Sequence, residues 1–179
     1  MPKPLHIILR RTSELGDAER QAVVQVCTAA HQHDFSELFG FLPPEGLHVL
    51  GYIGDQLAGH AVVTTRWLQF EHGLLLRTAY VDAVATEPTY QRLGVGSAVL
   101  RALAEAIGDY DIACLETDRE SFYDRLGWEE WRGPTAGRSD EGLVPTPQQT
   151  GIMILRLPRT PELALDGLLT IECQGVRIW

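Results

Sequence analysis

Residues 91–97 read Gln91-Arg92-Leu93-Gly94-Val95-Gly96-Ser97 and join two segments with different hydrophobic patterns. The segment before them, residues 74–86, is typical of a β-strand, and residues 95–107 place apolar side chains at helical spacing until Gly108. The loop therefore leads into a helix N-terminus, where unpaired N–H groups and the helix dipole bind phosphate. Gly94 and Gly96 let the main chain approach a pyrophosphate closely, and Arg92 adds a charge-assisted donor. On this motif alone, an ordinary helix start is the alternative.

Outward from this loop, the hydrophobic periodicity predicts a mixed α+β fold whose strands form an antiparallel meander. Strands are expected at residues 5–9, 47–53, 57–70, 74–86, 112–115 and 152–157, and helices at 17–31, 36–39, 95–107 and 121–126. The segments 168–171 and 176–179 are expected to pair at a sheet edge. Residues 133–149 are dominated by Gly, Pro, Thr and Ser, so we expect them to be the least ordered stretch and to flank a site.

Length and composition exclude several classes of protein. The chain has 179 residues, 45% of them hydrophobic and 22% charged, which predicts a single domain over residues 1–179. A net charge of -9 opposes binding to nucleic acid or an anionic membrane, and no apolar run approaches the length of a membrane span. Lys3 is the only lysine, which excludes a Walker-type phosphate loop and a Schiff-base enzyme.

The cysteines and histidines indicate neither a disulfide framework nor a metal centre. Cys27, Cys114 and Cys173 are widely separated in apolar sequence, which is typical of reduced thiols and favours a cytoplasmic location. His31 and His33 do not share a helix face, and no further ligand set accompanies them, so a solvated helix end is the favoured interpretation. We therefore expect no metal.

A second motif gives the sequence a specific family resemblance. The segment Phe122-Tyr123-Asp124-Arg125-Leu126-Gly127-Trp128 follows a predicted strand downstream of the glycine-containing loop. Together with residues 91–97 it resembles the GNAT superfamily of N-acetyltransferases, over roughly residues 5–158. The resemblance implies a GNAT fold, with a central, mostly antiparallel splayed sheet and helices on both faces, and acetyl-CoA as the cosubstrate. It also implies that residues 91–97 grip the pyrophosphate and that backbone groups around Val84 and Thr86 hold the pantetheine arm.

A closer resemblance is to the aminoglycoside 2'-N-acetyltransferases. It is carried by Tyr80–Thr86, Arg132–Thr135, Val144–Pro147 and the final Gly175–Trp179. It implies a small-molecule aminoglycoside as substrate, a homodimer, and a C-terminal carboxylate at the substrate site, a position available to Trp179. It further implies that substrate is bound by Asp34, Asp82, Ala83, Glu116 and Thr117. For Glu116 and Thr117, a solvated strand end is the alternative.

Asp82 and Tyr123 are the candidates for acid–base chemistry. In a regular strand Tyr80, Asp82, Val84 and Thr86 share one face, which is largely apolar. Asp82 is then either a general base or a structural acceptor, and the resemblance to enzymes with an amine-deprotonating acid here, acting through water, favours the base. Tyr123 is either a core tyrosine or the acid that protonates the departing CoA thiolate, and the matching motif around it favours the acid.

The chain also departs from the related enzymes. Where they carry further acids that bind amino groups, this chain has Phe39, Thr150 and Arg177, which predicts a substrate that is less cationic or bears a carboxylate for Arg177. Kasugamycin fits this description. The apolar run Leu38–Pro44 is either a narrow wall of the substrate site or a buried lid segment. Glu116 stands where many GNAT members have an asparagine that contacts CoA. The resemblance therefore does not imply a CoA contact at Glu116.

The sequence thus predicts direct transfer of acetyl from acetyl-CoA to the 2'-amine of an aminoglycoside, with kasugamycin as first choice and antibiotic resistance as the consequence. A backbone N–H would polarise the thioester carbonyl, and no covalent enzyme intermediate is required. Two alternatives stay open. One is acetylation of another small amine or of a protein N-terminus, and the other is a non-catalytic CoA-binding module.

Overall fold

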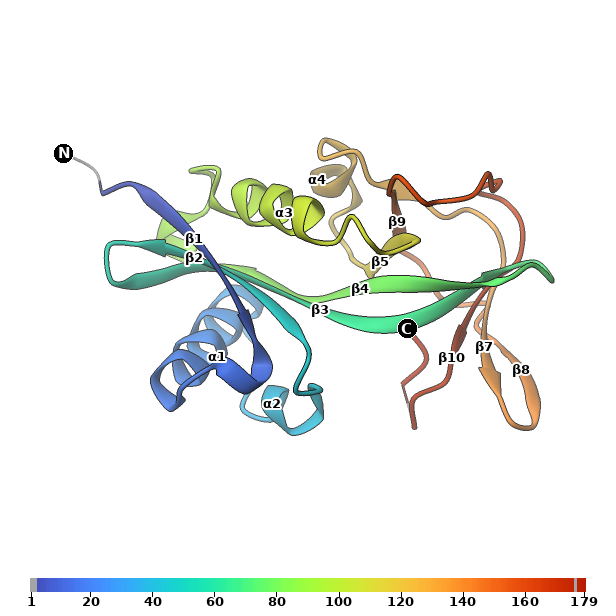
Figure 1. The fold of residues 1–179 in the computed structure, drawn as a ribbon, viewed down its shortest axis with the longest axis horizontal. Coiled ribbons are helices and arrows are strands. Elements are labelled where there is room, and N and C mark those ends of the chain that lie inside the picture. The colour runs from blue at the N-terminus through green and yellow to red at the C-terminus, as the bar shows by residue number, and fades with distance from the viewer. Residues whose placement is uncertain (1–2, 176) are drawn as a thin grey trace. The chain divides into compact units, whose positions relative to one another are not determined.

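The protein is described by a computed structural model that covers residues 3–175 and 177–179. The chain forms two compact units. The first unit comprises Met1–Thr64 and Val81–Ala106, and the second comprises Thr65–Tyr80 and Ile107–Trp179. Two long strands, β3 (Gln56–Phe70) and β4 (Leu75–Thr86), contribute residues to both units (Figure 1). The expectation of one domain over residues 1–179 stays a prediction.

The first unit is built on a meander of antiparallel strands. β1 (Leu5–Arg11) pairs with β2 (Leu47–Ile53) from Leu5↔Ile53 to Arg11↔Leu47, and β2 pairs with the first part of β3. The turn at Gly54-Asp55 closes the β2–β3 hairpin, and Gly54 has a φ of 62°, a conformation that favours glycine. The strands predicted at 5–9, 47–53 and 57–70 are therefore confirmed, with β1 extending to Arg11.

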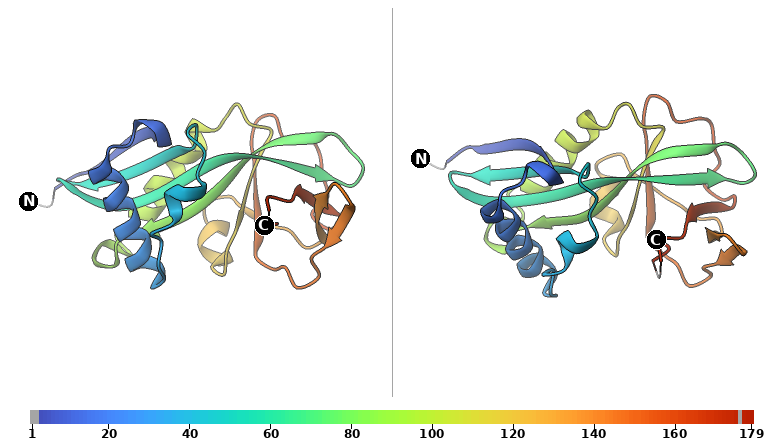
Figure 2. Two further views of the ribbon diagram at one scale, coloured as in Figure 1. Left: turned by 90° about the horizontal axis from the view of Figure 1, so that it is seen from below. Right: turned by 60° about the horizontal axis from the view of Figure 1, so that its bottom comes forward.

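Helices cover both faces of this first sheet, as predicted (Figures 1 and 2). On one face, α1 (Asp17–His31) and α2 (Leu38–Phe41) contribute Val26 and Leu38 to an apolar cluster that includes Leu50 of β2. On the other face lies α3 (Val95–Ala106), which begins after a short 3-10 turn at Pro88–Tyr90. A Cβ added to Gly59 would lie 2.7 Å from a methyl group of Val95, so the glycine lets α3 approach the sheet closely.

The second unit contains most strands of the same sheet, whose main path has the order β6-β9-β5-β4-β3-β10-β7-β8, with β2 and then β1 joined to β3 off this path. Its further strands are β5 (Ile112–Glu116), β6 (Glu129–Glu130), β7 (Thr135–Ser139), β8 (Gly142–Pro145), β9 (Ile152–Arg156) and β10 (Leu169–Glu172). β4 and β5 run parallel but pair only from Thr78↔Ile112 to Tyr80↔Cys114. Beyond that point β5 continues to Glu116 with β9 as its partner, which agrees with the predicted splayed sheet. The short helix α4 (Glu120–Asp124) follows β5.

Two expectations about the second half of the chain are wrong. Residues 133–149 contain the β7–β8 hairpin, because turn-forming residues flank two short strands that are stabilised by pairing with each other. Residues 168–171 do not pair with residues 177–179, the described part of the other segment. They fall largely in β10, which lies between β3 and β7, while an isolated bridge links Gln174 to Arg177. Val176, part of that expected edge pair, lies outside the described residues.

The core of the second unit is a cluster of buried apolar side chains that includes Trp131 and Trp179. The three cysteines are free thiols: Cys27 and Cys114 are buried and Cys173 is half-buried. Burial raises the pKa of Cys27 to about 12, so its thiol stays protonated at neutral pH. None of the helices described is both long and apolar enough to cross a membrane.

Candidate active site

The glycine-containing loop of the first unit has the local geometry expected of a phosphate-binding turn. Gln91, Arg92, Leu93 and Gly94 are all exposed, whereas Val95 is buried as the first residue of α3. Arg92 and Gly94 have φ values of 64° and 84°, so the chain passes twice through the left-handed region before the helix begins. Alternating left-handed residues turn successive N–H groups outward, and the first N–H groups of α3 have no partner within the helix. The residues therefore fit a pyrophosphate group.

The β4 segment with Asp82, Ala83, Val84 and Thr86 is less regular than the sequence suggested. All four residues are half-buried, and Ala83 has a φ of 49° in the middle of the strand. A left-handed residue interrupts the pleat, so the simple alternation that placed Asp82, Val84 and Thr86 on one face does not hold through Ala83. For a non-glycine residue this conformation costs about 1–2 kcal/mol, which neighbouring contacts must offset.

The carbonyl of Ala83 contacts the buried imidazole of His60, behind which His48 and Thr12 extend a chain of hydrogen bonds. It also accepts a longer hydrogen bond from Sγ of Cys27 at 3.8 Å. Nδ1 of His60 lies 2.8 Å from the Ala83 oxygen, and Nε2 of His60 lies 2.9 Å from Nδ1 of His48. The hydroxyl of Thr12 lies 3.0 Å from Nε2 of His48. Both imidazole side chains are fully buried. Burial lowers the pKa of His48 to about 3, with smaller effects of His60 and Arg20, and lowers that of His60 to about 4.

The sequence reasoning missed this histidine chain. A signal was present, because His48 and His60 interrupt two otherwise apolar strands of one predicted hairpin. In the register, Leu50 lies opposite His60 and His48 lies opposite Val62, which places the two histidines diagonally across β2 and β3. A third histidine also reaches β4: Nε2 of His31 lies 2.9 Å from the Val84 oxygen. His31 is thus more than a solvated helix end.

Asp34 and Phe39, two predicted substrate contacts, also belong to the first unit. The carboxylate of Asp34 is exposed and accepts hydrogen bonds from the backbone and hydroxyl of Ser36, at 2.8 and 3.0 Å, which lower its pKa. Phe39 is half-buried and stacks on His48, with ring centroids 5.7 Å apart. In the run Leu38–Pro44, Leu38 is buried but Phe41 is 63% exposed, so part of this segment is core and part is surface.

Tyr123 occupies a buried position in the second unit. Its ring packs edge-on against Phe122 and Trp128, with centroid distances of 5.1 and 5.9 Å. Burial raises the pKa of Tyr123 to about 12, which a hydrogen bond with Thr117 and the charge of Arg119 partly oppose. The phenol therefore stays protonated across the neutral and mildly alkaline range and can act as a proton donor.

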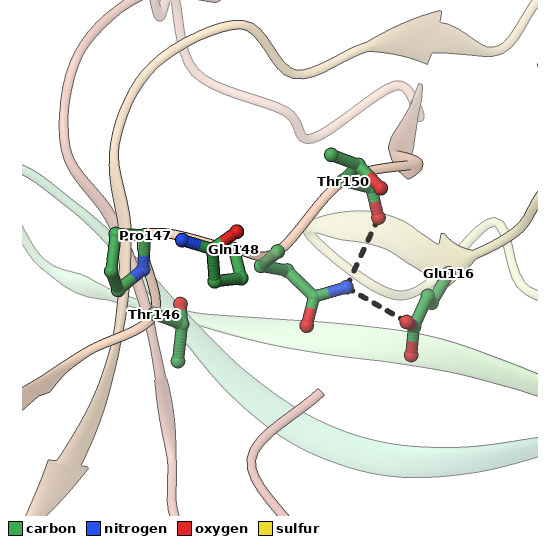
Figure 3. Close-up of a pocket in the computed structure, with 6 residues that line it drawn as sticks. Glu116, Thr146, Pro147, Gln148 and Thr150 are labelled. Atoms are coloured by element: carbon green, nitrogen blue, oxygen red, sulfur yellow. Dashed lines mark hydrogen bonds between the residues drawn. The ribbon is translucent and has the colours of Figure 1, made fainter.

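Glu116 and Thr117 stand at the end of β5, beside a polar cavity of the second unit. The amide of Gln149 donates to the carboxylate of Glu116 at 2.8 Å and to the carbonyl of Thr150 at 3.0 Å (Figure 3). These residues line a cavity of about 430 Å³ together with Thr146, Pro147 and Gln148. The N–H of Thr117 donates to the carbonyl of Gly151 at 2.9 Å. The backbones of these two residues form a tight crossing, in which the Thr117 carbonyl leaves no space for a side chain at Gly151. Sequence reasoning did not predict Thr146, Gln148 or Gln149 as lining residues.

The C-terminal residues connect to the same cavity through Thr146. Trp179 is only 5% exposed, and its indole N–H donates to the hydroxyl of Thr146 at 3.1 Å. The Thr146 hydroxyl in turn lies 2.7 Å from that of Thr135. Nε of Arg177 donates to the main-chain oxygen of Trp179 at 2.7 Å, and its guanidinium lies 5.4 Å from the ring centroid of Tyr80. Arg177 is thus engaged with the C-terminal segment.

The predicted site residues divide between the two units. Asp34, Phe39, Asp82, Ala83, Val84, Thr86 and residues 91–97 belong to the first, and Glu116, Thr117, Tyr123, Arg177 and Trp179 belong to the second. In the described parts of the chain, no group of three or more His, Cys, Asp or Glu side chains is arranged to hold a metal ion.

An exposed glycine-containing turn before a helix, on a splayed sheet with helices on both faces, is the arrangement that the resemblance to GNAT acetyltransferases implies. Residues 12–131 match the sequence model described as the acetyltransferase (GNAT) domain, and the chain therefore belongs to the GNAT family. Over 170 residues it is 29% identical to the aminoglycoside 2'-N-acetyltransferase of Mycolicibacterium fortuitum, covering 92% of this chain and 86% of that protein.

Solved structures agree on the fold. A GCN5-related N-acetyltransferase from Kribbella flavida superposes with a TM-score of 0.62 at 18% identity, covering 73% of this chain but only 34% of its own length. ElaA from Escherichia coli gives a TM-score of 0.61 at 16% identity, covering 86% of this chain and 100% of its own. The ribosomal-protein-S18-alanine N-acetyltransferase from Escherichia coli gives 0.58 at 19% identity, covering 89% and 99% of the two chains. The protein is a GNAT acetyltransferase, a class that uses acetyl-CoA.

Proposed function

We propose that this protein transfers acetyl from acetyl-CoA to the 2'-amino group of an aminoglycoside, with kasugamycin as the first substrate to test. The observation that carries the proposal is the likeness to the aminoglycoside 2'-N-acetyltransferase of Mycolicibacterium fortuitum, which extends over 92% of this chain. A match of that length includes the elements that carry Asp82 and Tyr123 as well as the glycine-containing loop.

In the proposed reaction the neutral amine attacks the thioester carbonyl directly. Asp82 accepts the proton that the ammonium loses, directly or through water, and the attack forms the C–N bond of the amide. The C–S bond then breaks, Tyr123 supplies a proton to the CoA thiolate, and the second proton that the nitrogen loses as the amide forms restores the phenol of Tyr123. Burial of Tyr123 supports this role, because a pKa of about 12 keeps the proton in place until negative charge develops on sulfur.

Binding of the cosubstrate is assigned to the first unit. Residues 91–97 would hold the pyrophosphate through main-chain N–H groups at the start of α3, with Arg92 as an added charge. Backbone groups around Val84 and Thr86 would hold the pantetheine arm as an added strand does. The exposed, left-handed turn at Arg92 and Gly94 supports the first assignment.

The cavity beside Glu116 supports a substrate rich in hydroxyl groups. Its lining offers threonine hydroxyls and glutamine amides, which suit sugar hydroxyls, and among the described lining residues Glu116 alone is charged. A polycationic antibiotic would find a single carboxylate there. Together with Arg177, this composition favours an aminoglycoside with few amino groups or with a carboxylate of its own.

Mass spectrometry tests the proposal. The enzyme is incubated with acetyl-CoA and either kasugamycin or a deoxystreptamine antibiotic, and the site of the added acetyl group is located by fragmentation. We expect acetylation at the 2'-amine, with kasugamycin consumed faster. Other small amines and a peptide with a free N-terminal alanine complete the acceptor panel. Acetylation confined to one of these, or calorimetric binding of CoA without turnover of any amine, contradicts the proposal.

The two catalytic assignments are tested separately. We expect Tyr123→Phe and Asp82→Ala each to reduce turnover by ~10²-fold or more while acetyl-CoA affinity stays within a few-fold of wild type. Because the pKa of Tyr123 is raised, turnover should show no loss attributable to its ionisation as the pH rises to ~10. Near-normal rates in both variants would remove these residues from the mechanism.

A further inference from the structure

The hydrogen-bond chain Thr12–His48–His60–Ala83 has a direction that its acceptor dictates. The carbonyl of Ala83 can only accept, so Nδ1 of His60 carries the proton at this 2.8 Å contact. In a neutral imidazole Nε2 of His60 is then the acceptor, and Nδ1 of His48 donates to it at 2.9 Å. Nε2 of His48 is left as an acceptor for the hydroxyl of Thr12 at 3.0 Å, a shorter contact than the 3.3 Å between the same hydroxyl and the carbonyl of Gly46. Each link thus fixes the tautomer of the next.

The chain ends on a strained residue of β4. Ala83 has a φ of 49°, a conformation that an L side chain rarely adopts, and its carbonyl is held by a fully buried imidazole. The residues before and after it are Asp82, the assigned base, and Val84, an assigned backbone contact of the pantetheine arm. The direction of the Ala83 carbonyl determines the orientation of the peptide that follows, and hence where β4 presents Val84.

We propose that His60, whose tautomer is dictated by the Ala83 carbonyl and whose Nε2 is occupied by His48, is a positioning residue for acetyl transfer: its Nδ1–H anchors the Ala83 carbonyl and sets the path of β4 past Asp82 and Val84. This inference rests on the proposed function, because it assigns the purpose of the chain to the base and to the cosubstrate contacts. His60 itself contacts neither reactant.

Two substitutions of His60 distinguish positioning from packing. The amide nitrogen of Asn occupies nearly the place of Nδ1, so His60→Asn keeps a donor for the Ala83 carbonyl. His60→Leu keeps the apolar volume but removes the donor. Both variants leave Nδ1 of His48 without its acceptor. If His60 only filled the core, Leu would therefore be tolerated better than Asn, because Asn is smaller and brings a polar amide oxygen into the core. If His60 positions β4, the order of activity is reversed.

The experiment measures kcat, KM for acetyl-CoA and the calorimetric Kd of acetyl-CoA for wild type, His60→Asn and His60→Leu, with folding checked by circular dichroism. We expect His60→Leu to lower kcat ~10-fold or more and to weaken acetyl-CoA binding several-fold, whereas His60→Asn stays within ~3-fold of wild type in both. Val63→Ala, which truncates another buried residue of β3, is the control for lost packing and should keep wild-type kcat. Equal losses in the two His60 variants, or a better Leu variant, overturn the inference.

Failure of the proposed function gives a different pattern. If wild type binds acetyl-CoA but acetylates no amine, the proposed transfer reaction is refuted. The positioning role of His60 is then decided by the Kd of acetyl-CoA alone, and we expect His60→Asn to bind acetyl-CoA more tightly than His60→Leu. If wild type binds no acetyl-CoA, both the proposed function and this inference are refuted. Thr12→Val, which removes the hydroxyl at the far end of the chain, should fall between wild type and His60→Leu.

Discussion

Acidification should unfold this protein mainly through His48 and His60. Both imidazoles are fully buried and stay neutral in the folded state, with pKa values lowered by burial to about 3 and about 4. In the unfolded chain a histidine has a pKa of about 6.5. The unfolded state therefore binds more protons below that pH. The stability associated with these residues is fully present above about pH 6.5 and is lost as the pH falls from there toward the folded pKa values.

The size of the loss follows from the two pKa values of each histidine. Between pH 7 and pH 5 a histidine whose folded pKa is about 4 or lower destabilises the folded state by ~2 kcal/mol, so the pair accounts for ~4 kcal/mol. In a protein of this size that corresponds to a fall in melting temperature of roughly 8–16 °C. Because the folded stability of a domain is typically 5–15 kcal/mol, this single pair removes a large part of it.

Urea unfolding at pH 7 and pH 5, followed by circular dichroism, measures the effect. The variant His48→Asn/His60→Asn removes both titrating groups and should lose ~4 kcal/mol less than wild type between the two pH values. The matched control is His6→Asn/His72→Asn, in which two exposed histidines are replaced, and it should keep the wild-type pH dependence. Each protein is compared with itself, so the cost of the substitutions at pH 7 cancels.

An equal loss in wild type and in the His48/His60 double variant would show that these imidazoles are not held neutral by the fold. The same conclusion would follow if the control with exposed substitutions removed the pH dependence instead. Either result would also weaken the argument for fixed tautomers along the chain.

Three other substitutions have defined outcomes. Gly151→Ala places a methyl group against the Thr117 carbonyl at a φ of 70°, so we expect a loss of ~3 kcal/mol or more in urea unfolding; a change below 1 kcal/mol would contradict the tight crossing. Gly94→Ala meets no neighbouring atom but is strained by a φ of 84°, so calorimetry should show acetyl-CoA affinity ~5-fold or more weaker, and unchanged affinity would argue against the turn as its binding site. Trp179→Phe removes the indole donor to Thr146 and should cost ~1–2 kcal/mol in thermal unfolding, whereas unchanged stability would show that this contact is dispensable.

Elements with strong periodicity were predictable from the sequence. The helix expected at 17–31 is α1 to the residue, because apolar residues recur on one face after Asp17, and the expected hairpin matches β2 and β3 within one residue. The short helices shifted: α2 lies two residues later than expected and α4 is Glu120–Asp124 in place of 121–126. Short segments contain too few residues for a periodic signal.

The β7–β8 hairpin and the place of β10 were not predictable in this way. The β8 residues are all exposed, so no apolar alternation marks them, and their strand geometry comes from pairing with β7. β10 pairs with β3 and β7, which are remote in sequence, and local pattern carries no information about partners at that separation.

At the candidate site, the sequence indicated which residue types to examine but not their surroundings. Tyr123 is buried and residues 91–94 are exposed, and neither property is specified by the motif that contains it. The left-handed conformation of Ala83 could not be predicted, because alanine has no preference for it. The histidine chain that ends on Ala83 joins residues from β2, β3 and β4, which are remote in sequence. The roles of Asp82 and Tyr123 stay predictions.

The interior place of β10 has a consequence for how the chain is made. β3, β7 and β8 leave the ribosome before β10, yet β10 is the strand that pairs with β3 on one side and β7 on the other. Until Glu172 has emerged, the nascent second unit exposes unsatisfied backbone groups along both of those strands. A stalled or prematurely terminated translation product would therefore present two open β-edges, which makes it a candidate for chaperone capture or aggregation.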